Sequence, residues 1–97
     1  MQNAMRPIHP GEVLREEFLL PLEMSGSALA AALKVPANRI NGIVGESRSV
    51  SADTALRLSR YFGTTAEFWM NLQKTYELRL ADRQIGSRIR REVKPAA

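Results

Sequence analysis

Residues 25–44 read SGSALAAALKVPANRINGIV, and this stretch decides the fold. Its aliphatic residues recur at helical spacing on both sides of a short break, which predicts two helices that share a small core. Five positions would close that core: Leu29, Leu33, Val35, Ile40 and Ile43. Ala30 falls where the helices would cross, and a steep crossing there leaves room for little more than a methyl group. This order is typical of a helix-turn-helix, in which the second helix is presented to DNA.

The turn between these two helices departs from the usual pattern. Lys34 stands where a helix-turn-helix commonly has glycine, because the backbone there is left-handed. A side chain at such a position costs on the order of 1 kcal/mol, which a small domain can tolerate. The alternative interpretation is an ordinary pair of antiparallel helices that packs within the protein and contacts no DNA.

Size and composition exclude several classes of protein. The chain of 97 residues is long enough for one small domain with tails. It has no cysteine and one histidine, His9, so we expect no disulfide, no metal site and no cofactor. No nucleophile–base pair or phosphate-binding loop is recognisable, so we expect no catalytic residues and no enzyme activity. The apolar segments are shorter than a membrane span and no secretory signal is evident, which predicts a cytoplasmic protein without membrane contact.

Charge is distributed unevenly along the chain, whose formal net charge is +4. Residues 1–33 carry two basic and four acidic side chains, whereas residues 34–60 carry five basic and two acidic ones. Positive charge therefore begins at the predicted turn and second helix, where phosphate contacts would need it. Residues 79–97 hold six basic and two acidic side chains. They could form a phosphate-binding arm, a docking surface for an acidic partner, or a solvated tail.

Local signals predict an all-α domain of five helices. The first would begin at His9-Pro10, where proline suits the first helical position, and run to about Leu20 before Pro21 stops it. Ser25 would cap the second, which ends at Leu33, and the third would begin at Pro36. Arg15 would belong to the solvated face of the first helix.

Capping residues also mark the ends of the predicted fourth helix and the start of the fifth. Ser51 would cap the fourth, and Gly63 would end it in a left-handed conformation. Its buried face would consist of Ala52, Ala55, Leu58 and Phe62. Thr64 to Glu67 form a predicted capping box for the fifth helix.

The fifth helix carries aromatic side chains around Trp69 that could form either a base-stacking platform or part of the core. Their helical spacing would bury them, which favours core packing. From Leu78 to Ile89 the pattern remains helical, with an expected interruption at Gly86. Ile85 and Ile89 would then need a partner, which indicates a homodimer seam or a second protein.

The predicted third helix supplies the candidate base-reading residues. With Ile40, Ile43 and Val44 inward, an outward stripe would hold Asn38, Gly42 and Gly45, flanked by Arg39 and Asn41. Asparagine can pair with adenine and arginine with guanine in the major groove, so Asn38 is the leading base reader. Ser27, Ser47 and Arg48 occupy positions that could contact phosphates, although exposed side chains of these types often contact only solvent.

Three segments in the same order resemble the HigA (also called VapI) antitoxin family, a branch of the lambda-repressor-like helix-turn-helix proteins. They are HPGE at 9–12, VPANRINGIV at 35–44 and AEFWMNLQ at 66–73, with ADTALRLSRYFG at 52–63 between them. The resemblance covers residues 6 to 80. It implies a dimer that binds operator DNA, represses its own operon and neutralises a HigB-type toxin, a RelE-like endoribonuclease that cleaves mRNA. It also places the family's DNA-contacting positions at Ala37, Asn38, Arg39 and Asn41.

We therefore expect an N-terminal arm (1–8), a helix-turn-helix domain (9–80, with the motif at about 25–44) and a basic extension (81–97) that is helical or disordered. Two other hypotheses stay open. One is a stand-alone helix-turn-helix regulator without a toxin, and the other is a helical adaptor that binds only protein. A toxin-sized neighbouring reading frame would separate the first two, and DNA binding would separate both from the adaptor.

Overall fold

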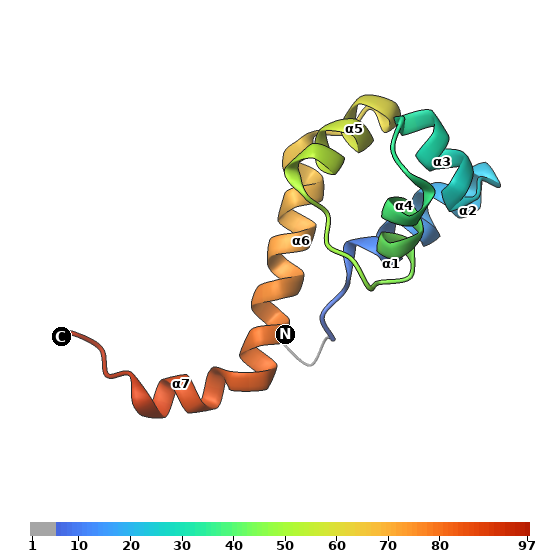
Figure 1. Ribbon diagram of the computed structural model, residues 1–97. Helices are drawn as coiled ribbons and strands as arrows, with labels where there is room; N and C mark the ends of the chain where they lie inside the picture. The colour runs from blue at the N-terminus through green and yellow to red at the C-terminus, as the bar shows by residue number, and fades with distance from the viewer. Residues whose placement is uncertain (1–5) are drawn as a thin grey trace.

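The computed structural model describes residues 6–97, and every regular element in that range is helical. The helices form five continuous stretches (Figure 1). The first consists of α1 (Pro10–Val13), the π-helical segment η1 (Leu14–Leu19) and α2 (Leu20–Leu22). Then follow α3 (Gly26–Leu33), α4 (Ala37–Val44) and α5 (Ala52–Phe62). The last consists of α6 (Ala66–Ala81), the π-helical η2 (Asp82–Gly86) and α7 (Ser87–Glu92). The predicted five-helix all-α fold is confirmed, while residues 1–5 of the predicted arm lie outside the described range.

The first stretch begins where the sequence predicts but ends later. The side chain of His9 caps α1, and Pro10 occupies its first turn. The prediction that Pro21 stops the helix is wrong, because the chain stays helical to Leu22 and leaves through Glu23 in a left-handed conformation. In η1 the Leu20 N–H reaches the Arg15 carbonyl, five residues back. This wider π-helical turn precedes Pro21 and relieves the clash that a proline ring makes in a regular α-helix.

Helices α3 and α4 form the predicted helix-turn-helix. The Ser25 hydroxyl accepts a hydrogen bond from the Ala28 N–H at 3.0 Å and so caps α3. Lys34 ends α3 with φ 63°, as the turn pattern predicts. Pro36 is the N-cap of α4, so the helix proper begins one residue later than expected. Ala30 is 1% exposed at the crossing of the two helices.

Ser51 is the N-cap of α5, and its hydroxyl accepts a hydrogen bond from the Thr54 N–H. Gly63, with φ 75°, is the C-cap. Ala52 is exposed, contrary to the prediction, and Thr54 is buried in its place. The difference arises because Ala52 is the first residue of the helix and lies at the edge of the packed face.

The start of α6 also differs from the predicted capping box by one residue. Thr65 is the N-cap and accepts a hydrogen bond from the Phe68 N–H at 3.0 Å. The Thr64 hydroxyl instead accepts a hydrogen bond from the indole Nε1 of Trp69 at 2.8 Å. A buried indole N–H needs an acceptor, and this requirement places Thr64 outside the helix. Trp69 is fully buried, so core packing is confirmed and base stacking on this ring is excluded.

The core lies between the first stretch, α3, α4, α5 and the first half of α6. Its buried apolar members are Leu14, Leu19, Leu29, Ala30, Leu33, Ile40, Ile43, Val50, Ala55, Leu58 and Trp69. Phe18 packs against this core from the first stretch, and the centre of its ring lies 4.8 Å from that of Phe62 and 5.1 Å from that of Trp69.

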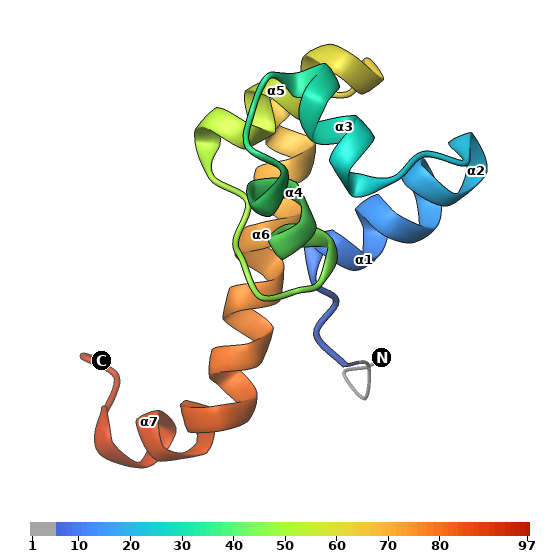
Figure 2. The ribbon, with the colours of Figure 1, turned by 45° about the vertical axis from the view of Figure 1, so that its right-hand side comes forward.

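The C-terminal part projects from this core. In Figures 1 and 2, α6 runs away from the other helices, and the chain then turns sharply into α7. The predicted interruption at Gly86 is wrong, because Gly86 keeps right-handed helical angles and the helix continues to Glu92. The chain bends through η2 without breaking, consistent with a π-helical turn. Within residues 6–97 no helix combines the length and the hydropathy needed to cross a membrane.

Candidate nucleic-acid interface

Helix α4 packs its apolar side against the core and leaves its polar side at the surface. Ile40 and Ile43 are fully buried, whereas Ala37, Asn38 and Asn41 are exposed. Figure 2 shows α4 between α3 and the loop that leads to α5. Among the described residues the Asn38 side chain has no hydrogen-bond partner, so its amide is free to pair with a base edge. The role of Asn38 as base reader stays a prediction.

The predicted outward stripe of Asn38, Gly42 and Gly45 is interrupted. A Cβ atom at Gly42 would lie 3.1 Å from the Cβ of Arg48, so the loop after α4 covers Gly42. The Ser47 hydroxyl donates a hydrogen bond to the Gly42 carbonyl at 3.2 Å and holds the loop there. Gly42 therefore serves the packing of the loop, and the accessible part of α4 is its N-terminal half.

Asn41 is held against the first turn of α3. Its side-chain Nδ2 donates a hydrogen bond to the Ser27 hydroxyl at 3.2 Å. A Cβ atom at Gly26 would fall 2.3 Å from the Asn41 Oδ1, so a larger residue at position 26 would displace the Asn41 amide. The pair joins the N-terminal turn of α3 to the middle of α4, and both residues remain exposed.

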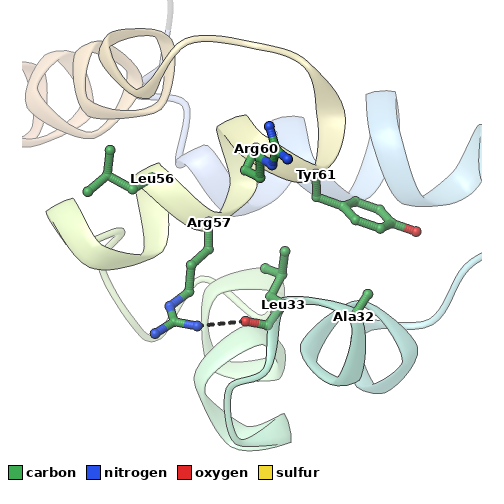
Figure 3. A pocket seen from close by; sticks show the side chains of 6 residues that line it. All are labelled: Ala32, Leu33, Leu56, Arg57, Arg60 and Tyr61. Atoms are coloured by element: carbon green, nitrogen blue, oxygen red, sulfur yellow. Dashed lines mark hydrogen bonds between the residues drawn. The ribbon is translucent and has the colours of Figure 1, made fainter.

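Arg39 belongs to a network that joins α3, α4 and α5. The Asp53 Oδ1 accepts a hydrogen bond from Arg57 Nε at 2.8 Å and one from Arg39 Nη1 at 2.9 Å. The Arg57 Nη1 also donates to the Leu33 carbonyl at 2.8 Å, as Figure 3 shows. That carbonyl lies at the C-terminal end of α3, where helix carbonyls lack intrahelical partners. The hydrogen bond from Arg57, together with the nearby Arg39, holds the pKa of the Asp53 carboxyl below its usual value.

The N-terminal turn of α1 packs directly against the C-terminal half of α4. A Cβ atom at Gly11 would fall only 1.7 Å from the Ile43 carbonyl oxygen, so no other residue fits without moving the backbone. Arg15 Nη1 donates to the Val44 carbonyl at 2.7 Å and Nη2 bonds Glu46 at 3.4 Å. Arg15 thus caps the last turn of α4. Its spacing in the sequence had predicted only a place on the solvated face of the first helix. Its partner lies 29 residues away, and no local signal predicts that contact.

The neutral form of His9 holds the N-terminal turn of α1, which packs against α4, in place. Its Nδ1 accepts a hydrogen bond from the Gly11 N–H at 2.8 Å, and its ring meets that of Tyr76 edge-on at 4.8 Å. Burial lowers the pKa of His9, while Glu46 and the Arg48 backbone carbonyl act in the opposite direction. A buried N-cap that needs an unprotonated Nδ1 is a structural residue.

The described residues contain no cluster of three metal-binding side chains. Among residues 6–97, the surface is hollowed at two places away from α4. One, of about 510 Å³, lies between α3 and α5 and is lined by Leu33, Leu56, Arg57, Arg60 and Tyr61 together with Ala32 (Figure 3). The other, of about 310 Å³, lies between the N-terminal segment and α6. Neither groove includes a residue of the exposed α4 face.

No model of a protein family matches the chain. Individual proteins match it closely. Over 81 residues it is 56% identical to virulence-associated protein I of Dichelobacter nodosus, which covers 84% of this chain and 75% of that protein. It is also similar to the structure of Pseudomonas aeruginosa antitoxin HigA with the higBA promoter, at 54% identity and a TM-score of 0.93, over 95% of this chain and 100% of the other.

The chain belongs to the HigA antitoxin family. A second HigA-like structure, antitoxin GraA in complex with its operator, is 49% identical with a TM-score of 0.91; the match covers all of this chain and 98% of the other. The family resemblance and the helix-turn-helix fold expected from the sequence are therefore confirmed. Within this HigA family member, Ala37, Asn38, Asn41 and Ser27 lie on one exposed face, and Ser47 and Arg48 lie in the adjoining loop.

Proposed function

We propose that this protein binds operator DNA as a homodimer, represses its own operon and neutralises a HigB-type endoribonuclease toxin. The observation that carries the proposal is the exposed N-terminal half of α4, whose Asn38 amide has no partner among residues 6–97. Two HigA-like relatives with the same fold were solved with promoter or operator DNA, which supports the same use of this helix-turn-helix. We propose a binding protein without catalytic activity, located in the cytoplasm with its operator.

In this proposal the contact residues have two roles. Asn38 reads a base edge, and Ala37 and Asn41 contact bases on either side of it. Ser27 donates its hydroxyl to a phosphate, and Ser47 exchanges its hydroxyl hydrogen bond to the Gly42 carbonyl for one to a phosphate. Arg48 supplies a cation without an ion-pair partner among the described residues. Arg39 keeps one N–H on Asp53 and offers its other guanidinium donors to the DNA backbone.

We propose that residues 9–80 form the DNA-binding domain, with residues 1–8 as an arm and 81–97 as an extension of separate function. A monomeric helix-turn-helix contacts too few base pairs for tight binding. Two copies about one turn of DNA apart, roughly 34 Å, would read a palindromic operator.

A fluorescence-anisotropy titration tests DNA binding. The duplex upstream of the gene and a scrambled duplex of equal composition are each titrated at two salt concentrations. We expect tight, sequence-dependent binding to the upstream duplex and weak binding to the scrambled one. Equal, weak binding to both would contradict the repressor function.

Co-expression with the neighbouring toxin-sized reading frame tests the antitoxin function. We expect growth arrest from that protein alone, and recovery with co-purification when this chain is present. Sequence-specific DNA binding without such a partner would instead favour a stand-alone regulator.

A further inference from the structure

Gln73 on α6 is a buried polar residue that lies outside the exposed face of α4. It is the last residue of the AEFWMNLQ segment at 66–73, and it is 4% exposed. Its side-chain Oε1 accepts a hydrogen bond from the Val50 N–H at 2.8 Å, and its Nε2 donates one to Glu77 Oε2 at 2.7 Å. Leaving a buried amide unpaired is costly, so these two hydrogen bonds fix the side chain in place.

The two partners of Gln73 allow its amide a single orientation. The backbone N–H of Val50 can only donate, and the ionised carboxylate of Glu77 can only accept. Turning the amide over would set donor against donor at Val50 and acceptor against acceptor at Glu77. Glu77, about one turn further along α6, therefore orients the amide so that its oxygen faces Val50.

The hydrogen bond to Val50 fastens the far end of the loop at 45–49, which passes α6 on its way from α4 to α5 (Figure 2). At the near end the Ser47 N–H donates to the Gly42 carbonyl at 2.9 Å. Val50 is 2% exposed, whereas residues 45–49 are all exposed. The loop is thus held at two points, and its exposed stretch carries the side chains proposed to contact phosphates.

We propose that Gln73 is a positioning residue for operator binding: its amide, oriented by Glu77, holds the loop at 45–49 so that Ser47 and Arg48 reach the DNA phosphates. This inference rests on the proposed function, because it explains how the chain places its phosphate contacts. Hydrogen bonds weaken steeply when their distance or angle departs from the ideal values. A loop released at Val50 would therefore lose phosphate contacts although Gln73 itself touches no DNA.

A glutamine that only fills the core would behave differently from a positioning residue. Its replacement would lower the stability of the domain and leave the DNA affinity of the folded protein unchanged. Replacement of a positioning residue lowers the DNA affinity while the protein is still folded. The affinity of folded variants, measured well below their unfolding temperature, separates the two roles.

Gln73→Met keeps the length of the side chain and removes both hydrogen bonds. We expect it to raise the Kd for the upstream duplex about tenfold and to lower the slope of log K against log salt by about one, because a phosphate contact is lost. Circular dichroism checks that the variant stays folded. Gln84→Met, the same change at an exposed glutamine of η2, is the matched control and should bind like the native protein. If Gln73→Met lowers stability but changes neither Kd nor slope, the inference is wrong.

Exchanging the two side chains tests the orientation of the amide. Gln73→Glu sets a second carboxylate against Glu77, and the two repel each other. Adding Glu77→Gln again pairs one acceptor with one donor, and the net charge equals that of the native chain. At pH 8 we expect the single variant to bind the upstream duplex about tenfold more weakly and the double variant to recover most of that affinity. Failure of the folded double variant to recover affinity would overturn the inference.

Asn71→Asp is the charge control for this exchange, because it adds the same negative charge at an exposed position of α6. We expect it to weaken DNA binding much less than Gln73→Glu does. Equal losses in the two variants would overturn the inference, since added charge alone would then account for the effect.

Hydrogen exchange measured by NMR tests the anchor in the native protein, whether or not the variants fold. We expect the Val50 amide to be protected about a hundredfold more than that of Ser49, which has no backbone acceptor among residues 6–97. Similar protection would overturn the inference, because the end of the loop would then be open. Native protein that fails to bind the upstream duplex contradicts the proposed function itself. Native binding that Gln73→Met leaves unchanged overturns only the role of Gln73.

Discussion

Gly11 at the start of α1 lies directly against the backbone of Ile43 in α4. A Cβ atom at position 11 would fall 1.7 Å from the Ile43 carbonyl oxygen, a distance at which the two helices must separate. His9 caps the same turn of α1, and Pro10 occupies its first position. The HPG sequence at 9–11 therefore determines how closely α1 packs against α4, the helix that we propose reads DNA.

We expect Gly11→Ala to destabilise the protein. In an exposed helix this change would gain up to about 1 kcal/mol, whereas overpacking a close contact costs roughly 1–3 kcal/mol. The net loss should appear as a lower urea midpoint with an unchanged m-value. Gly45→Ala, at an exposed glycine of the same region, is the control and should shift stability much less. Similar midpoints for the two variants would contradict the close packing.

We expect the stability of the protein to fall as the pH drops below about 6.5 because of His9. Burial lowers the pKa of His9 from its usual 6.5, so the folded protein disfavours the charged ring. The stabilising contribution is complete above pH 6.5 and is lost as the pH falls through 6.5 toward the lower folded value, because the unfolded chain then binds more protons. Protonation of Nδ1 also removes the acceptor for the Gly11 N–H.

His9→Asn is the matched variant, since asparagine can also cap a helix and does not titrate in this range. Urea unfolding at several pH values should show a smaller slope for this variant than for the native protein. Identical slopes would assign the acid sensitivity to other groups.

We expect Asp53→Asn to loosen the helix-turn-helix and to remove an acid-sensitive contribution to stability. The native carboxylate accepts hydrogen bonds from Arg57 and Arg39, and its pKa is lowered from its usual 3.8. Its contribution is therefore present above pH 3.8 and is lost as the pH falls through the folded value. Thermal unfolding between pH 6 and pH 3 should show a weaker pH dependence for the variant. Glu92→Gln, at an exposed position in α7, is the control, and an equal response from both variants would count against the network.

We expect Asn38→Ala to reduce sequence preference without reducing stability, because the native side chain has no hydrogen-bond partner among the described residues. Loss of a bidentate base contact should cost about 1–3 kcal/mol on the preferred duplex and little on a scrambled one. Anisotropy titrations on both duplexes measure the difference. Unchanged discrimination would show that another residue reads the base.

Arg48→Ala should instead weaken binding to every duplex and reduce the slope of log K against log salt by about one. The aliphatic part of Arg48 covers Gly42, so Arg48→Gln, which keeps much of that cover, separates the charge from the packing. If only Arg48→Ala weakens binding, the role of Arg48 is to hold the loop, and the proposed phosphate contact is wrong.

Some features of this protein follow from the sequence alone, because neighbouring residues determine them. Ser25 and Ser51 cap helices through their own first turns, and Gly63 and Lys34 take the left-handed angles that end α5 and α3. The apolar spacing around Ala30 is likewise sufficient to predict the crossing of α3 and α4. The HigA family resemblance rests on the same local motifs.

Other features depend on packing and on particular hydrogen bonds, which helix propensity, capping signals and apolar spacing do not predict. Pro21 stays within a helix because a π-helical turn precedes it, and Thr64 leaves the helix because the buried Trp69 indole needs its hydroxyl. Gly42 looked outward on a helical wheel, but the loop at Arg48 covers it. Arg39 is predicted from the sequence to flank the outward stripe, and in the structure it donates a hydrogen bond to Asp53 on another helix. The sequence by itself determined which segments are helical and which helix faces DNA in the proposal, since those depend on spacing and caps. Only the tertiary structure decided which polar groups on that face stay free, because long-range packing and hydrogen bonding occupy the others.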